Sequence, residues 1–251
     1  PLARRRHHRR LTPPMIRAVI CDIYGTLLEV GPPPPDAEAR WSRLWRTHVG
    51  TSRAPTLDEL EDAVRQRIPS HHAAGRARGL IQPEIDWPAL AADAFPDLNQ
   101  LPPTIRPEFF FQHARLRRST RLAPGAADCL RALHQSGRLL GIASNAQACT
   151  RLELARSLAD HGLDCSLFTE AASFFSYQHG VAKPDPRVFQ SLAHHLLSLG
   201  IEPSETLMVG DRLDTDIAPA TAAGWATWLL HPSPGPAAGD WPALLAWLDP
   251  A

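Results

Sequence analysis

The sequence predicts an α/β fold, in which a parallel sheet is covered by helices on both faces and carries an inserted helical segment. Three observations lead to this prediction. Short apolar runs rich in β-branched residues recur along the chain, helical patterns separate the later runs, and one long helical stretch interrupts the alternation. Continuous apolar strands that alternate with helices are typical of parallel sheets buried on both faces.

Five apolar runs are the expected strands: IRAVICDI (16–23), RLLGIAS (138–144), LDCSLF (163–168), ETLMVGD (205–211) and WATWLL (225–230). Three helical patterns separate them, at 125–137, 147–162 and 185–200. The last two end in Gly, as helix C-termini often do. Ligands of such sheets bind at the carboxyl ends of the strands, so we expect the functional site there.

The helical insert runs from residue 31 to residue 118. It opens with GPPPPD, a stiff proline linker, and continues with helical patterns at 37–49, 56–68, 84–95 and 107–118. Thr56 and Glu59 have the spacing of a capping box. We expect 31–118 to be a helical cap on an α/β core formed by 15–30 and 119–251, and 1–14 to be a disordered tail.

Composition indicates a globular protein, because 251 residues of which 44% are hydrophobic can bury one sizeable core. Five of the 26 basic residues fall in the first fourteen, which leaves 21 against 26 acidic residues, so we expect no nucleic-acid partner. No apolar run of the sequence approaches the ~20 residues of a membrane span. The four cysteines have no metal-binding spacing, which favours reduced thiols and a cytoplasmic protein. The sequence does not indicate an oligomeric state.

Four short stretches at or just after the expected strand ends carry polar residues suited to catalysis. They are Asp22 with Thr26, Ser144 with Asn145, Lys183 in GVAKPDPRVF, and Asp211, Asp214 and Asp216 in VGDRLDTD. Because the carboxyl ends of parallel strands meet at one edge of a sheet, we expect these groups to converge on one crevice.

Such a crevice has a definite chemistry. Neighbouring carboxylates raise one another's pKa unless a cation lies between them, and a protonated Asp22 would be a poor nucleophile. The acids therefore imply a metal ion, and all-oxygen ligands suit Mg²⁺. Lys183, the only lysine of the chain, adds a second positive charge. Thr26, Ser144 and Asn145 would bind substrate oxygens that gain charge in the transition state. The pattern predicts transfer of a phosphoryl group from a small molecule to Asp22, with Asp22 and Lys183 catalytic.

The order and spelling of these stretches resemble the haloacid dehalogenase-like hydrolase superfamily over the predicted core. The resemblance implies a Rossmann-like sheet with a helical cap inserted after the first strand. It also implies that Asp22 is nucleophile and metal ligand, that the backbone carbonyl of Tyr24 is a second ligand and that Asp211 is a third. Asp216, at the GDxxxxD spacing, is similar to the remaining acid, held on the metal through water. Asp214 fits the pattern less well.

Tyr24 departs from the pattern of most phosphatases of this family, which have a second Asp there to protonate the leaving group and then activate water. Tyrosine, with an ordinary pKa near 10, is a poor replacement, and general acid–base catalysis is typically worth ~10²–10⁴ in rate. The loss would matter less for leaving groups that need no proton.

A second interpretation follows from Tyr24. The 2-haloacid dehalogenases of the same family have a similar Asp-x-Tyr-Gly-Thr stretch, form an ester on the Asp and need no metal, but have Ser and Asn where this chain has GDRLDTD. Because an acidic cluster without a metal would disable Asp22, we favour a Mg²⁺-dependent phosphatase. A 2-haloacid dehalogenase remains the alternative, and a phosphate-binding protein with slow turnover is a third hypothesis.

Several polar and aromatic residues of the expected cap are candidates for lining the substrate pocket. They are Arg40, Trp41, Trp45, His71, His72 and Arg76. Amphipathic helices would place such residues for packing as well, so the sequence leaves both roles open.

Overall fold

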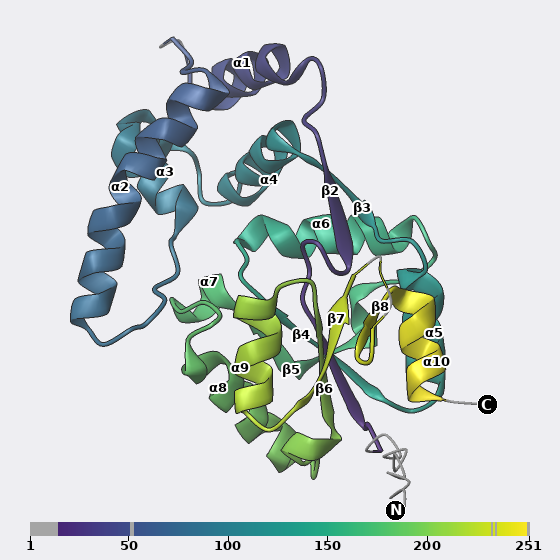
Figure 1. Cartoon of the computed structure of the whole chain (residues 1–251). Coiled ribbons are helices and arrows are strands. Elements are labelled where there is room, and N and C mark those ends of the chain that lie inside the picture. Colours follow the sequence, from purple (N-terminus) through teal and green to yellow (C-terminus); the bar gives the residue numbers. More distant parts are fainter. Residues whose placement is uncertain (1–14, 51–52, 232, 234, 250–251) are drawn as a thin grey trace, which may run out of the picture.

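A computed structural model describes residues 15–50, 53–231, 233 and 235–249 of the chain (Figure 1). The expected disordered tail, residues 1–14, lies outside the described residues. Within the described residues, no helix combines the length and the apolar character that crossing a membrane requires.

The centre of the fold is a parallel sheet with the strand order β5-β4-β1-β6-β7-β8. Its strands are β1 (Ala18–Cys21), β4 (Leu139–Ser144), β5 (Phe168–Phe175), β6 (Thr206–Gly210), β7 (Ala226–Leu230) and β8 (Ala238–Gly239). Every residue of β1 is buried, and β1 pairs with β4 on one side and with β6 on the other. The prediction of a Rossmann-like α/β fold is therefore confirmed.

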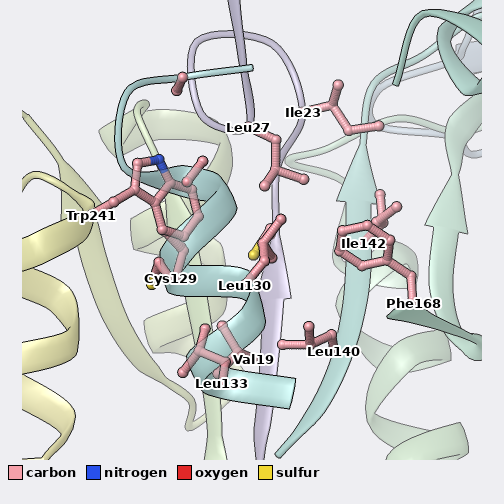
Figure 2. Close-up of a cluster of buried hydrophobic side chains, with 14 of the residues drawn as sticks. Val19, Ile23, Leu27, Cys129, Leu130, Leu133, Leu140, Ile142, Phe168 and Trp241 are labelled. Carbon is pink, nitrogen blue, oxygen red and sulfur yellow. The ribbon is translucent and has the colours of Figure 1, made fainter. Parts of the chain in front are cut away.

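Helices cover both faces of the sheet (Figure 1). They are α5 (Ala126–Gln135), α6 (Ala148–Ala159), α7 (Ser176–His179), α8 (Pro186–Ser198), α9 (Ala218–Ala222) and α10 (Trp241–Leu248). Successive residues of β1 point to opposite faces: Val19 packs in a hydrophobic cluster with α5, α6 and α10, whereas Ile20 packs in another with α8 and α9. Figure 2 shows the first cluster, in which Val19 lies among Leu130, Leu133 and Leu140. This double burial explains why the central strands β1, β4 and β6 have no polar face.

The expected strand at 163–168 is wrong. The Asp164 carboxylate accepts a hydrogen bond from the backbone N–H of Ser166 at 2.7 Å and caps a helical turn at Cys165–Leu167, so β5 begins only at Phe168. The apolar residues of this run pack on the core from the turn rather than from a strand. A side-chain cap thus overrides a strand-like composition.

The insert is helical, as expected, and lies between the two strands of a short antiparallel ribbon, β2 (Leu28–Gly31) and β3 (Ser119–Leu122). It contains α1 (Ala37–His48), α2 (Leu57–Ala77), α3 (Trp87–Ala94) and α4 (Arg106–Arg117), which share a hydrophobic cluster of their own. The capping box of Thr56 and Glu59 is confirmed, with both of its hydrogen bonds present. The division into a cap (31–118) and a core remains a proposal.

Helix α2 is longer than the sequence suggested, because it continues through Pro69 to Ala77. Proline removes one hydrogen bond of the helix, but the later turns are held by packing. Gly75 is buried so close to Pro83 that a Cβ atom at residue 75 would lie 2.4 Å from the proline ring. Pro83 in turn pairs with Val181 of the core, so the end of α2 is fixed against the core chain.

Candidate active site

Except for Asp214, the polar residues predicted to converge do meet at the carboxyl edge of the sheet. Asp22 follows β1, and its backbone N–H donates to the carbonyl of Val209 in β6 at 2.9 Å, so the parallel pairing continues to Asp22. Ser144 ends β4 and Asp211 follows β6 directly. Lys183 reaches the same edge from the loop between α7 and α8.

Lys183 lies between two carboxylates. Its Nζ is 2.8 Å from Oδ1 of Asp22 and 2.5 Å from Oδ1 of Asp216, and all three residues are buried. Burial alone would lower the pKa of Lys183, but the charges of Asp22 and Asp216 outweigh this effect and raise it. The ammonium group therefore stays charged at neutral pH.

Asp216 is positioned by the turn that follows β6. Its Oδ2 accepts a hydrogen bond from the backbone N–H of Arg212 at 3.1 Å, so both of its oxygens have partners. Burial raises the pKa of Asp216; Lys183 opposes this effect, and the charge of Asp22 adds to it. Gly210 makes room for the carboxylate, because a Cβ atom there would lie 2.4 Å from its Oδ2.

Asp211 occupies the more open side of the site. The Thr26 hydroxyl donates to its Oδ1 at 3.3 Å. Burial, and then the charge of Asp216, raise the pKa of Asp211. Gly25 has a φ of +80°, and a Cβ atom there would lie 2.4 Å from Oδ2 of Asp211. The tight turn after Asp22 thus needs glycine for its backbone conformation and for the space that the Asp211 carboxylate occupies.

Three carboxylates form a cluster that suits a divalent cation. Asp22, Asp211 and Asp216 each offer an oxygen, and these oxygens lie within 4.8 Å of one another. Lys183 contacts two of the three groups, while the raised pKa of Asp211 indicates a carboxylate whose charge is poorly compensated. All-oxygen donors with this excess of negative charge fit Mg²⁺.

The remaining predicted residues differ in their hydrogen-bond partners and in their exposure to solvent. Ser144 is buried, and its hydroxyl finds no hydrogen-bond partner among the residues that the structure describes. The amide group of Asn145 accepts from the backbone N–H of Lys183 at 2.7 Å and donates to its carbonyl at 2.9 Å, so Asn145 fixes the lysine loop. Asp214 points to solvent, with 67% of its side chain exposed, and pairs with Arg212.

Comparison with known proteins identifies the family. The model of the haloacid dehalogenase-like hydrolases matches residues 16–224. The chain belongs to this family. A hydrolase of Schizosaccharomyces pombe that is itself uncharacterized is 26% identical over 218 residues, which are 84% of this chain and 88% of the relative.

Two further relatives represent two activities. A glyceraldehyde 3-phosphate phosphatase of Methanopyrus kandleri is 35% identical over 104 residues, which are 41% of each chain. The crystal structure of a 2-haloacid dehalogenase from Pseudomonas syringae pv. tomato has 22% identity and a TM-score of 0.56, covering 93% of this chain and 98% of that chain. At 22% identity, the likeness to the dehalogenase shows a similar fold and does not indicate the activity. Membership of the family therefore leaves phosphatase and dehalogenase chemistry both open.

A cluster around Tyr24 in this hydrolase was not predicted from the sequence. The Tyr24 hydroxyl contacts Glu153 and Thr150 of α6 and accepts a hydrogen bond from Arg118 at 2.6 Å. Only 2% of Glu153 is exposed. Its position one turn after Thr150 and one turn before Ser157, both buried, places it on the inner face of α6, and this helical spacing is the signal that could have found it.

A cavity of about 650 Å³ lies between the helical insert and the α/β core beside this cluster. Trp87, Phe110 and His113 line it from the helical insert, and Gln147 and Tyr177 line it from the other side. Its walls suit the organic part of a small molecule.

The candidate pocket residues of the cap have different surroundings. His71 lines the cavity and contacts the backbone carbonyl of Glu84 at 2.9 Å. Trp41 and Trp45 are instead buried in the cap's own hydrophobic cluster, and Arg40 pairs with Asp36 at 3.7 Å. For both tryptophans, the packing interpretation holds.

Proposed function

We propose that this hydrolase is a Mg²⁺-dependent phosphatase of a small phosphorylated metabolite. One carboxylate oxygen of Asp22 forms a bond to phosphorus while the bond from phosphorus to the leaving oxygen breaks. Water then cleaves the aspartyl-phosphate and restores Asp22. The observation that carries this proposal is the cluster of Asp22, Asp211 and Asp216, of which Asp22 and Asp216 share one buried ammonium group.

The cluster supports phosphoryl transfer because its charges match a phosphate ester. A carboxylate must approach a substrate that is itself a dianion, and Lys183 neutralises part of that repulsion next to Asp22. Asp22, Asp211 and the backbone carbonyl of Tyr24 would hold Mg²⁺, with Asp216 joined to it through water. Mg²⁺ bound there would supply the remaining positive charge for the phosphoryl oxygens.

Neutral groups complete the proposed site. The Ser144 hydroxyl, which has no other partner among the described residues, would donate to a phosphoryl oxygen. The second N–H of the Asn145 amide would do the same, and the Thr26 hydroxyl, which donates to Asp211 in this structure, would turn to the phosphoryl oxygen. Lys183 would be held for this task by Asn145, which bonds both the N–H and the carbonyl of the lysine backbone.

Tyr24 limits which substrates we expect to react well. Because its hydroxyl is held by Glu153 and Arg118, it does not offer a proton beside Asp22. We therefore propose substrates whose leaving group needs little protonation. Alkyl phosphates should react more slowly, by up to the ~10²–10⁴ that general acid catalysis contributes.

The lack of a proton donor at Tyr24 also favours one alternative function. A 2-haloacid dehalogenase would use Asp22 to displace halide from carbon, forming an ester that water hydrolyses, and halide leaves without a proton. Asp211 argues against it, since its carboxylate has a raised pKa and would serve no purpose without a metal. Slow turnover of a tightly bound phosphate ligand is the third possibility.

We also propose a cytoplasmic enzyme with a small-molecule substrate and without nucleic-acid or membrane partners. The free state of all four cysteines supports this assignment, because such thiols persist in reducing compartments. The mildly acidic body of the chain disfavours a polyanionic partner.

A paired assay tests the function. Phosphate release from p-nitrophenyl phosphate is measured with Mg²⁺ and with EDTA, beside chloride release from 2-chloropropionate, with Asp22→Asn as the inactive control. Phosphate release that depends on Mg²⁺ supports the proposal. Chloride release that EDTA leaves unchanged would establish the dehalogenase instead, and tight phosphate binding without either product would establish the binding protein.

A further inference from the structure

Tyr24 is held in a buried polar cluster that includes the chain's exit from the cap. Its hydroxyl donates to Oε2 of Glu153 and accepts from Nη2 of Arg118, while the guanidinium group lies 4.5 Å from the centre of its ring. Arg118 also pairs with Glu153 at 2.9 Å. Because Arg118 directly follows α4, the last helix of the insert, this contact joins the end of the insert to Tyr24 and α6.

A second set of hydrogen bonds joins the same helix to another part of the cap. At the start of α6, the Gln147 side chain accepts from the N–H of Trp87 at 3.0 Å and donates to the carbonyl of Ile85 at 2.8 Å. The N–H of Gln147 donates to Oγ1 of Thr150 at 3.1 Å, and the Tyr24 hydroxyl lies 2.9 Å from the same oxygen. A continuous path of hydrogen bonds therefore leads from Tyr24 to the start of α3.

We infer that Arg118 and Glu153 are positioning residues, which fix Tyr24 and so seat the Asp22 loop only when the cap is docked on α6. This inference rests on the proposed use of Asp22 as the nucleophile. Tyr24 is two residues from Asp22, so a shift of its side chain moves the backbone that carries the attacking carboxylate. The tyrosine thus couples cap docking to nucleophile placement.

The geometry of the cluster favours this role over proton transfer. The Tyr24 hydroxyl already donates to Glu153 and accepts from Arg118, so it has no free proton to offer beside Asp22. The Arg118–Glu153 ion pair is costly to bury alone, and the Tyr24 hydroxyl gives both charges an additional partner.

The first experiment removes only the Tyr24 hydroxyl, by Tyr24→Phe. Its ring and the contact with the guanidinium group remain, so the fold should persist. Misplacement of a nucleophile by about 1 Å can cost ~10²-fold, so we expect kcat on p-nitrophenyl phosphate to fall by about 10- to 100-fold with KM changed by less than about threefold. Glu170→Gln, in an exposed pair with Arg151, is the matched control and should retain wild-type kcat.

Hydrogen exchange measures the coupling without any substrate. In Tyr24→Phe, the amides of residues 84–90 should exchange at least several-fold faster than in the wild type, although they lie sixty or more residues away from Tyr24 along the chain. The amides of α8, on the opposite face of the sheet, are the internal control and should not change. A tyrosine with a purely local structural role would leave residues 84–90 unaffected.

Arg118→Lys is a second variant, because a lysine keeps the charge but loses the planar group that meets Tyr24 and Glu153 together. Arg118→Lys should reproduce both the fall in kcat and the faster exchange at residues 84–90. Glu153→Gln keeps an acceptor for the Tyr24 hydroxyl, so its kcat should fall less than that of Glu153→Ala. Unchanged exchange at 84–90 in both Tyr24→Phe and Arg118→Lys would overturn the coupling, whatever the activity. Absence of phosphatase activity in the wild type would instead refute the proposed function, while the exchange data would still decide the coupling.

Discussion

Lys183→Met would remove the ammonium group while keeping most of the length and the apolar stem of the side chain. In the wild type, Nζ lies 2.8 Å from Asp22 and 2.5 Å from Asp216, and lysine and carboxylates are all shielded from water. The variant would leave two buried carboxylates facing each other without their shared cation. We therefore expect a loss of stability as well as of activity.

The size of the loss follows from this geometry. At an effective dielectric constant of about 20, unit charges at these distances attract by roughly 6 kcal/mol per pair. The cost of removing three charges from water offsets much of that attraction, and removal of one partner of a buried ion pair typically costs about 3–5 kcal/mol. We expect the free energy of unfolding to fall by about this amount.

Urea unfolding near neutral pH with EDTA, followed by circular dichroism, measures the loss. The pKa of Lys183 is raised from its ordinary value of 10.5, so its stabilising contribution is complete below that pH and disappears only as the pH rises through the higher folded value. Arg151→Met is the matched control, since its ion pair with Glu170 is exposed and should contribute less than about 1 kcal/mol. A Lys183→Met protein as stable as this control would refute the electrostatic reasoning.

Three other predictions follow from the site and the cap. Asp211→Asn should abolish the stimulation of phosphate release by Mg²⁺, measured as the ratio of rates with Mg²⁺ and with EDTA, because it removes a charged ligand. Gly25→Ala should reduce that ratio and destabilise the protein by about 1–3 kcal/mol, since its φ of +80° disfavours alanine and the new methyl group would displace Asp211. Burial, with the charges of Arg117 and Arg118, lowers the pKa of His113 from 6.5 to about 3, so stability should fall by about 2 kcal/mol as the pH decreases from 7 to 5. His113→Gln should flatten this dependence in urea titrations.

Each of these predictions has a discriminating control. Gly137→Ala introduces the same backbone strain at a φ of +77° but into open space, so it should leave the response to Mg²⁺ intact. An Asp211→Asn enzyme that still responds fully to Mg²⁺ would contradict the proposed ligand set. For His113, the free energy of unfolding falls on acidification because the unfolded chain takes up a proton below pH 6.5 while the folded protein does not. Stability that rises on acidification would contradict the buried, neutral imidazole.

The sequence predicted the sheet and the convergence of the acids because both follow from local patterns. An apolar run fully buried on both faces, such as 18–21, can be recognised without knowing its neighbours. Parallel strands then bring Asp22 and Asp211 together, because each directly follows one of two paired strands. The prediction failed at 163–168, where one carboxylate, that of Asp164, turns an apolar run into a helical turn.

The contacts of Tyr24 could not be predicted from local sequence patterns. Tyr24 and Glu153 are 129 residues apart, and their meeting depends on how α6 is rotated about its axis. Arg118 joins them only because the insert returns to the core at that residue. Local spacing could place Glu153 on the inner face of α6, but the identity of its partners depends on the three-dimensional path of the cap.

The single lysine has a practical consequence. Reagents that acylate amines would find one side-chain target in the chain, and 97% of that residue is shielded from solvent. Its labelling rate would therefore report how often the crevice opens, and any compound that occupies the crevice should slow the reaction. The labelling rate of Lys183 can therefore be used to screen for ligands without measuring turnover and without adding a probe group.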